Sequence, residues 1–166
     1  MNPVITPLKN LDIDAIVALA KPIWHEHYTP IIGEQQVNYM LEKFQSREAI
    51  RSQLEQGYQY FQVGEPSNLL GYFSTQFRDN ASLFISKFYL SKLARGKGIG
   101  KQMLKFIEQL ANSNKCQTID LTVNKLNPAY QVYLKLGFAN QGAVEFDIGN
   151  GYIMDDFLMS KAVPHQ

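Results

Sequence analysis

A run of alternating glycines constrains the fold of this chain more than any other stretch. The run is Arg95-Gly96-Lys97-Gly98-Ile99-Gly100, and it lies between a predicted strand, 83–90, and a strongly periodic predicted helix, 99–111. The first N–H groups of a helix have no intrahelical partners, and the helix dipole adds positive potential, so such a turn forms an anion site. Glycine removes the Cβ atoms that would hold a phosphate away from the amides. The sequence therefore predicts that the amides from Gly96 to Lys101 bind a diphosphate, with Arg95 and Lys97 adding positive charge.

Two familiar phosphate-binding loops do not fit this run. A Walker A loop requires Gly-Lys followed by Ser or Thr, whereas Lys101 is followed by Gln102. A dinucleotide fingerprint requires the spacing G-x-G-x-x-G, but the glycines here alternate. Asp120 follows at a suitable distance, yet the residues after it place it inside a predicted strand, while the ribose-binding acid stands at a strand's end. Both loops are therefore excluded.

The run instead resembles the acyl-CoA loop of the GNAT superfamily of N-acetyltransferases, whose signature is R/Q-x-x-G-x-G/A. Arg95, Gly98 and Gly100 match it, and Phe88-Tyr89-Leu90 occupies the place of that family's fourth strand. Downstream, the stretch 127–138, Asn-Pro-Ala-Tyr-Gln-Val-Tyr-Leu-Lys-Leu-Gly-Phe, is similar to the family's second signature. The two signatures occur in order, separated by one helix and one strand. The resemblance extends more loosely over nearly the whole chain.

The expected fold is α/β (α+β), with helices on both faces of a mixed, mostly antiparallel central sheet. Strands 83–90 and 118–123 should form its one parallel pair if the crossover is right-handed. Asp12 is the expected N-cap of a first helix that Pro22 should kink or divide, and Ser46 and Gly137 should cap later helices. The other expected strands are 4–7, 58–63, 69–77, 143–147 and 152–159, and the other helices are 34–44, 47–56 and 128–136.

The composition is that of an ordinary globular protein. Apolar residues make up 45% and charged residues 19% of the 166 residues, which fits one domain over 1–166. A net charge of +1 gives no argument for nucleic acid or for an anionic membrane. The chain starts without the pattern of a signal peptide, and its single cysteine suits a reducing compartment. We therefore expect a cytoplasmic protein without a metal site.

The resemblance implies that acetyl-CoA binds along the strand 83–90 and the glycine run. In the family, the pantetheine arm lies between two parallel strands that splay apart, so Phe88, Tyr89 and Leu90 would pair with it through their backbone. The N–H of Leu90 would polarise the thioester carbonyl. Asn127 would contact the cofactor from the other side. Because the spacing from Asn127 to the glycine that ends its helix is one residue shorter than usual, Asn124 is the alternative.

Tyr133 is the candidate general acid. When an amine attacks acetyl-CoA, the departing thiolate needs a proton, and a phenol with a pKa of about 10 is reasonably matched to a thiol with a pKa of about 8.5. The second signature places Tyr133 on the cofactor side of its helix. The other interpretation is that Tyr133 only packs the helix.

The general base and the acceptor site are less well defined by the sequence. Many family members carry a glutamate on the fourth strand, but this chain has no carboxylate from 83 to 90. His25 and His27 are candidate bases because an imidazole can take a proton near neutral pH, although a surface or capping role is as compatible with the sequence. The candidate residues for the acceptor site are Trp24, Glu26, Tyr28, Glu34, Asp155 and Asp156.

The resemblance thus implies an N-acetyltransferase that moves an acetyl group to a primary amine of a small molecule or peptide by direct transfer in a ternary complex. A helical insert after the first strand, which the polyamine-acetylating branch shares, makes polyamines a reasonable first panel by analogy. The rival hypothesis is a non-catalytic acyl-CoA-binding module. We also expect that the chain can form a homodimer through its final hairpin.

Overall fold

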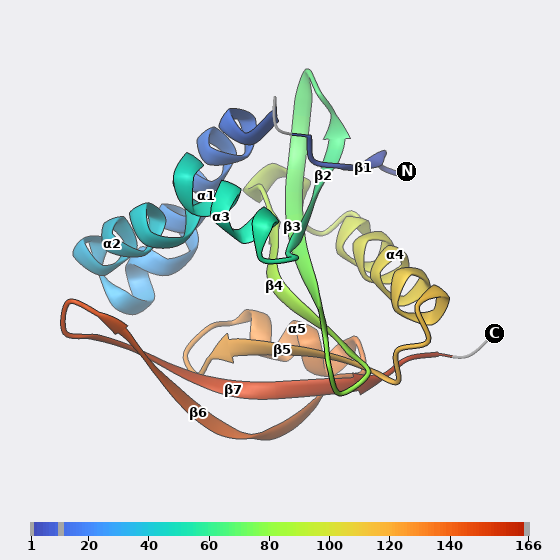
Figure 1. The fold of residues 1–166 in the computed structure, drawn as a ribbon. Helices are drawn as coiled ribbons and strands as arrows, with labels where there is room; N and C mark the ends of the chain where they lie inside the picture. Colours follow the sequence, from blue (N-terminus) through green and yellow to red (C-terminus); the bar gives the residue numbers. More distant parts are fainter. Residues whose placement is uncertain (1, 10–11, 165–166) are drawn as a thin grey trace. The chain divides into compact units, whose positions relative to one another are not determined.

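The computed structural model describes residues 2–9 and 12–164. Hydrogen bonds order seven strands as β1-β2-β3-β4-β5-β7-β6 (Figure 1), which confirms the expected mixed sheet. The chain divides into two compact units: unit 1 comprises the residues up to Gln76 with Ser86–Phe106, and unit 2 comprises Phe77–Ile85 with the chain from Ile107 onward. β3 (Asn68–Arg78), β4 (Ser82–Leu90) and α4 (Ile99–Ser113) each contribute residues to both units.

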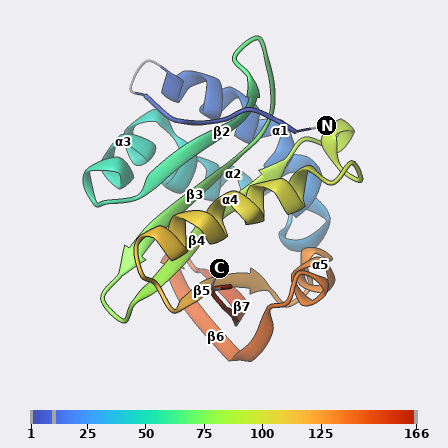
Figure 2. The same ribbon diagram turned by 90° about the vertical axis from the view of Figure 1, so that its right-hand side faces the viewer.

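Unit 1 has helices on both faces of its strands. α1 (Ile13–Ile32), α2 (Glu34–Gln45) and α3 (Arg47–Glu55) lie on one side of β2 (Gln59–Glu65) and β3, and the start of α4 lies on the other (Figures 1 and 2). The short strand β1 (Ile5–Pro7) pairs with the outer edge of β2. This arrangement follows from the alternation of side chains along a strand, which gives each strand two apolar faces to cover.

Side-chain contacts agree with this two-sided arrangement. On one face, the hydroxyl of Tyr72 donates a hydrogen bond to Gln45 of α2, and Gln45 donates to the hydroxyl of Tyr60 at 3.0 Å. On the other face, the ring of Phe61 packs against Phe106 of α4, with the centroids 5.2 Å apart. Tyr60 and Tyr72 are 2% and 0% exposed. Their hydroxyl groups are buried together with partners, as buried polar groups require.

The first helix differs from the expectation in two ways. α1 runs without interruption from Ile13 to Ile32 through Pro22 and Pro30, so the division expected at Pro22 is wrong. Both prolines are exposed, where water can satisfy the carbonyl groups that lose an intrahelical partner. Asp12 precedes the helix but its side chain makes no capping hydrogen bond. By contrast, Ser46 accepts a hydrogen bond from the N–H of Ala49 at 3.2 Å, as expected of an N-cap.

Unit 2 contains the parallel pair and a long hairpin. β4 pairs with β5 (Thr118–Asn124) from Ser82↔Thr118 to Ile85↔Leu121, so this ladder stops five residues before β4 ends. β6 (Ala139–Gly149) and β7 (Tyr152–Ala162) form the hairpin, and β7 also pairs with β5. β6 is longer than the expected strand 143–147. The turn places Asn150 and Gly151 at φ 55° and 81°, as a two-residue hairpin turn requires.

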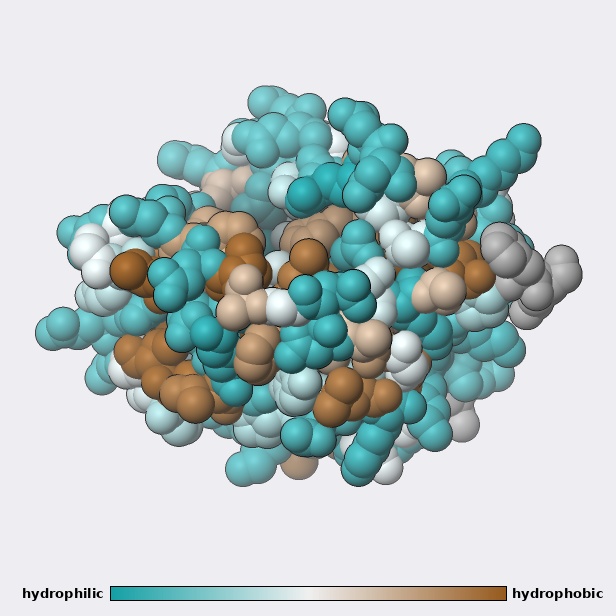
Figure 3. Space-filling view, turned by 90° about the horizontal axis from the view of Figure 1, so that it is seen from below, coloured by the Kyte–Doolittle hydropathy of each residue, from teal (hydrophilic) through white to brown (hydrophobic). Residues whose placement is uncertain are grey.

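Apolar side chains at the surface do not form one continuous area in the view of Figure 3, where brown patches are separated by hydrophilic residues. Exposed apolar residues of unit 2 include Leu126, Val132, Ile153 and Leu158. Within residues 2–9 and 12–164, no helix is both long enough and apolar enough to cross a membrane.

Candidate active site

The glycine run of unit 1 has the geometry of an anion-binding turn. Gly96 and Gly98 adopt φ values of +76° and +79°, which other residues rarely adopt. A Cβ atom built on either glycine would meet no other atom within 4 Å. The N–H of Gln102 bonds the carbonyl of Gly98 at 3.3 Å at the start of α4, so the amides before Gln102 precede the regular ladder of the helix. Open space and amides that precede the helical ladder together fit the diphosphate of a nucleotide cofactor.

Arg95 is held beside this turn by an ion pair that the sequence did not reveal. Its guanidinium donates two hydrogen bonds to the carboxylate of Glu26, at 3.0 and 2.9 Å, and its Nε donates to the carbonyl of Leu90 at 3.2 Å. The hydrogen bonds from Arg95, more than any other influence, lower the pKa of Glu26. Glu26, which we expected in the acceptor site, is therefore bound to Arg95 of the glycine run.

The end of β4 is held close to β3. A Cβ atom on Gly71 would lie 2.3 Å from the carbonyl oxygen of Tyr89 and 2.8 Å from Leu90 Cδ2, so only glycine permits this approach. The N–H of Ser91 donates to the carbonyl of Leu70 at 2.8 Å. The segment Phe88–Leu90, which we expect to pair with the cofactor, is thereby positioned from the β3 side.

An aromatic cluster of unit 1 contains three of the residues that we expected near the acceptor. Trp24 is 2% exposed and its indole N–H donates to the hydroxyl of Tyr72 at 2.9 Å. The hydroxyl groups of Tyr28 and Tyr89 are 2.8 Å apart, and the ring of His27 packs edge-on against Tyr28 at 4.8 Å. Trp24 thus belongs to the core of the cluster, whereas His27 and Tyr28 are partly exposed. His25 lies on the same helix, partly exposed.

Lys87 is a polar residue of β4 that the sequence analysis did not assign to the site. Its Nζ donates to the hydroxyl of Ser86 at 2.7 Å and lies 6.0 Å from the centroid of the Phe44 ring. Burial lowers the pKa of Lys87 to about 8, since a desolvated ammonium is less favourable than in water. A lysine between apolar residues in a predicted central strand was the available signal, since lysine is rare in such a position.

In unit 2, the second signature forms α5 (Ala129–Lys135) and its two flanking turns. The side-chain oxygen of Asn127 accepts a hydrogen bond from the N–H of Ala129 at 2.8 Å, so Asn127 caps the helix. Asn127 is 6% exposed. Asn124, its alternative, accepts from the N–H of Leu126 at 2.9 Å. Gly137 follows the helix at φ +100°, as expected.

Tyr133 lies in the last turn of α5 and is partly exposed. Its ring packs edge-on against Phe138, with the centroids 5.8 Å apart, and its carbonyl accepts the N–H of Phe138 at 3.0 Å. The helix and Phe138, the residue just before β6, thus fix the position of the ring.

The two adjacent aspartates of β7 have different surroundings. Asp155 forms an ion pair with Lys125 at 2.8 Å, and its side chain is 50% exposed. Asp156 is 1% exposed, and its Oδ1 has no hydrogen-bond partner within the described ranges. Burial raises the pKa of Asp156 to about 6; a hydrogen bond with Thr122 opposes this shift and the charge of Asp155 adds to it. We expected both residues in the acceptor site.

Comparison with known families agrees with the geometry of the loop. Residues 28–151 match the family model described as an acetyltransferase (GNAT) domain. The chain belongs to the GNAT acetyltransferase family. This confirms the resemblance inferred from the two signatures.

Individual relatives of this GNAT protein share less of its length. It is 36% identical over 70 residues to a probable spermine N(1)-acetyltransferase of Bacillus subtilis subsp. natto, and 34% identical over 70 residues to a spermine/spermidine N(1)-acetyltransferase of Bacillus subtilis. Each match covers 41% of this chain and 46% of the relative, so the chain spans about half the length of the curated relatives it matches.

Solved structures show the same fold over almost the whole chain. The PaiA N-acetyltransferase of Thermoplasma acidophilum, solved with coenzyme A, has a TM-score of 0.79 at 23% identity and is matched over 98% of this chain and 99% of its own. A GCN5-related N-acetyltransferase of Rhodopseudomonas palustris has a TM-score of 0.82 at 15% identity, over 98% and 96% of the two chains.

The buried carboxyl of Asp156 in this GNAT protein leads to a prediction about stability. Its pKa is raised from 3.8 to about 6, so between these values the folded state binds more protons than the unfolded state. Its contribution to the free energy of unfolding therefore falls as pH rises from about 4 to about 6, by about 3 kcal/mol at most. Asp156→Asn should remove this dependence. We expect the difference in unfolding free energy, variant minus wild type, to grow across this window and then level off.

Urea unfolding of the wild type and the variant at pH 4.5, 5.5, 6.5 and 7.5 measures the difference in their free energies of unfolding. Asp155→Asn is the matched control, because Asp155 is paired with Lys125 and half exposed. A difference for Asp156→Asn that stays constant over this range would contradict the raised pKa.

Proposed function

We propose that residues 1–166 form one acetyl-CoA-dependent N-acetyltransferase domain, which moves an acetyl group to a primary amine by direct transfer in a ternary complex. The observation that carries the proposal is the open turn at Gly96 and Gly98 before α4, in a chain of the GNAT family. Bound acetyl-CoA would supply an acetyl group activated as a thioester. The crystal structure of the Thermoplasma relative with coenzyme A supports this choice of cofactor.

The proposed contacts with the cofactor come from three segments. The amides of Gly96, Gly98, Ile99, Gly100 and Lys101 would bind the diphosphate, with Arg95 and Lys97 as cations. Phe88, Tyr89 and Leu90 would pair through their backbone with the pantetheine amides, and the N–H of Leu90 would stabilise charge on the thioester oxygen. Asn127, which caps the start of α5, would contact the cofactor from the other side.

The proposed proton transfers use side chains that carry titratable protons. Tyr133 would donate its phenolic proton to the departing thiolate sulfur. His25 or His27, or a water between them and the amine, would accept the proton that the attacking amine loses. In the transfer, the N–C bond forms and the C–S bond breaks. The products are the free thiol of CoA and the acetylated amine, an amide.

The proposed acceptor is a polyamine or another primary alkyl amine. The names of the two Bacillus relatives support this class. Tyr28 and Asp155 stay candidate contacts for the acceptor, and Trp24 would support Tyr28 from the aromatic core. Glu26 contributes through Arg95, with which it is paired.

The proposal is tested with purified protein and acetyl-CoA. Release of free thiol is measured with a panel of spermidine, spermine, lysine, an aminoglycoside and a peptide with a free N-terminus. We expect release with at least one polyamine, with the acetylated product identified by mass spectrometry. Binding of CoA by calorimetry without transfer to any amine of the panel would contradict catalysis and favour a non-catalytic CoA-binding module.

The ion pair between Glu26 and Arg95 leads to a prediction about cofactor affinity. A diphosphate must compete with the Glu26 carboxylate for the guanidinium, and both side chains are more than a third exposed. Glu26→Gln should therefore bind CoA a few-fold more tightly at low salt, and the gain should shrink at 0.5 M salt because exposed charges are screened. Isothermal titration calorimetry measures both values. Asp14→Asn, which removes the exposed ion pair of Asp14 with Arg47, is the control. Weaker binding by Glu26→Gln would mean that Glu26 holds Arg95 in its binding position.

A further inference from the structure

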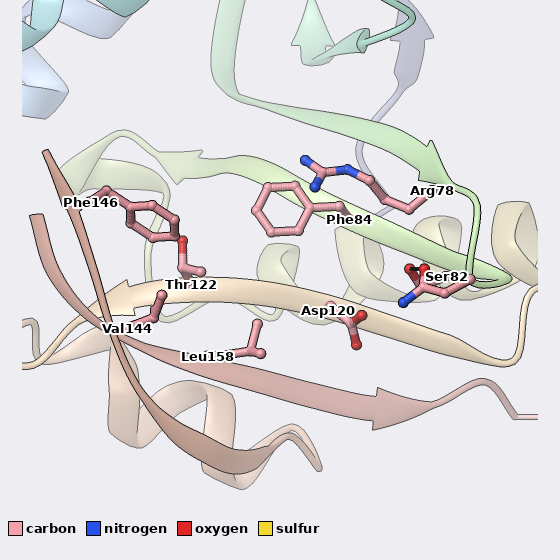
Figure 4. Close-up of a pocket in the computed structure, with 9 residues that line it drawn as sticks. Arg78, Ser82, Phe84, Asp120, Thr122, Val144, Phe146 and Leu158 are labelled. Atoms are coloured by element: carbon pink, nitrogen blue, oxygen red, sulfur yellow. Dashed lines mark hydrogen bonds between the residues drawn. The ribbon is translucent and has the colours of Figure 1, made fainter. Parts of the chain in front are cut away.

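A pocket opens on one face of the unit 2 strands. It has a volume of about 340 Å³, which is within the range of small-molecule sites. Its lining includes Phe84 on β4, Thr122 on β5, Leu158 on β7, and Val144 and Phe146 on β6, which Figure 4 shows around it. Leu158 and Phe146 are 38% and 41% exposed. The pocket therefore combines a hydroxyl with an apolar surface that solvent can reach.

Three neighbours of Asp156 line this pocket. Its Cα partner on β6 is Val144, and it hydrogen-bonds with Thr122 of β5; both residues line the pocket. Leu158, two residues further along β7, also lines it. Alternate residues of a strand point to the same face, and paired residues of neighbouring strands do as well. Asp156 therefore shares the face of the sheet on which the pocket lies.

The carboxylate of Asp156 lacks a cation among its described neighbours. It is 1% exposed, its Oδ1 has no partner within residues 2–9 and 12–164, and Lys125, which follows its Cα partner Asn124, is bound to Asp155. A buried carboxylate with an unpaired oxygen costs free energy that a bound ammonium would offset. The raised pKa of Asp156 expresses that cost. A fold that keeps such a group beside a pocket has the features of a cation-binding site.

We propose that this pocket binds the acceptor of the reaction as a primary alkyl ammonium ion, with the ammonium on Asp156 and Thr122 and the alkyl chain against Val144, Phe146 and Leu158. The inference rests on the proposed function for the identity of the ligand as acceptor. In this proposal Asp156 determines specificity for a cationic acceptor. It binds the ammonium group and takes no part in the transfer of the acetyl group.

The end of the pocket away from Asp156 should discriminate less strongly between charged and uncharged ligand groups. It has one group of each sign: Asp120, whose Oδ1 accepts from Ser160 at 2.6 Å, and Arg78, whose guanidinium lies 4.2 Å from the centroid of the Phe84 ring. Asp120 is four residues from Asn124, the Cα partner of Asp156, which corresponds to about 13 Å along a strand. Butylamine and butane-1,4-diamine are both short enough to fit within this length, so both should bind.

The test uses the full chain and three probes: butylamine, butane-1,4-diamine and, as the uncharged control, butan-1-ol. Binding is followed by NMR at pH 7.5, together with the carboxyl ¹³C titration of Asp156. We expect both amines to bind, butanol not to bind, and saturation with amine to move the titration midpoint of Asp156 to lower pH. Asp156→Asn should weaken amine binding at least tenfold, whereas Glu145→Gln, which removes an exposed carboxylate from the other face of β6, should change it less than threefold.

The pH dependence separates this site from the other charged groups on the same face. Other charged residues near Asp156 in unit 2 are Asp155 on β7, Asp120 on β5 and Arg78 on β3. Two uncharged residues, Thr122 of β5 and Val144 of β6, share its face of the sheet. Amine binding to the wild type should fall below about pH 6, where Asp156 takes up a proton, and binding to Asp156→Asn should be flat there. Leu158→Lys is a second variant: its ammonium would compete with the amine for Asp156 from an exposed position.

Kinetics distinguishes this inference from the proposed function. If the wild type acetylates butylamine, Asp156→Asn should raise the KM for the amine with kcat little changed. A fall in kcat at constant KM, or equal amine affinity in Asp156→Asn and Glu145→Gln, would overturn the assignment of Asp156 and leave the acetyltransferase proposal intact. Amine binding that depends on Asp156 without transfer to any amine would support the site and overturn the proposed reaction.

Discussion

Replacing Gly98 by alanine should weaken CoA binding about a hundredfold. Gly98 has φ +79°, and no atom lies within 4 Å of the point where a Cβ would be placed. A methyl group there would occupy the space that a phosphate needs in order to reach the amides of the turn. A hydrogen bond to a charged group contributes about 1.5–3 kcal/mol, so the loss of one or two accounts for this factor. Isothermal titration calorimetry with CoA measures the change.

Gly57 provides the matched control for this substitution. It also has a positive φ, +92°, with no atom within 4 Å of its Cβ position, but it follows α3, away from the glycine run in the sequence. Gly57→Ala and Gly98→Ala therefore carry a similar backbone strain, of about 1 kcal/mol, and should lower the melting temperature similarly. Only Gly98→Ala should lose affinity for CoA. Equal CoA affinity in the two variants would show that the turn does not bind the diphosphate.

The parts of the fold that the sequence predicted well are those with local chemical causes. The glycine run needs positive φ at Gly96 and Gly98, Ser46 offers an oxygen to a helix N-terminus, and Gly137 allows a helix to end. Each of these effects acts within a few residues. Pro22 was the exception: a local rule predicted a kink or a division, and the division does not occur because the buried stripe of α1, with Ile16, Ile23 and Trp24, keeps one helix packed on unit 1.

The parts that the sequence could not predict depend on distant pairings. Glu26 and Arg95 are separated by 69 positions, and no local pattern relates the two. The choice between Asp155 and Asp156 depends on the register of β7, since a shift of one residue exchanges the faces. That register is set together with β6, whose pairing shifts between Asn140 and Gly142. The roles of the two aspartates therefore become distinct only in the folded hairpin.

Replacing Tyr133 by phenylalanine should lower kcat by a factor of 10² to 10⁴, the usual contribution of a general acid. The phenyl ring keeps its edge-on contact with Phe138, so the fold of α5 should not change. Because the hydroxyl would act on the leaving sulfur only as the C–S bond breaks, the KM for acetyl-CoA should stay within about threefold. Steady-state kinetics with the best acceptor of the panel measures both parameters.

Tyr130→Phe is the control on the same helix. The hydroxyl of Tyr130 accepts a hydrogen bond from Asn140 at 3.2 Å, and its ring packs on Phe157 at 5.3 Å, so this variant also loses one phenolic hydroxyl from α5. It should keep kcat within about threefold of the wild type. A higher KM for acetyl-CoA at constant kcat in Tyr133→Phe would make Tyr133 a cofactor contact only. Full activity of Tyr133→Phe would instead mean that the thiolate takes its proton from water, because no step would then need the phenol.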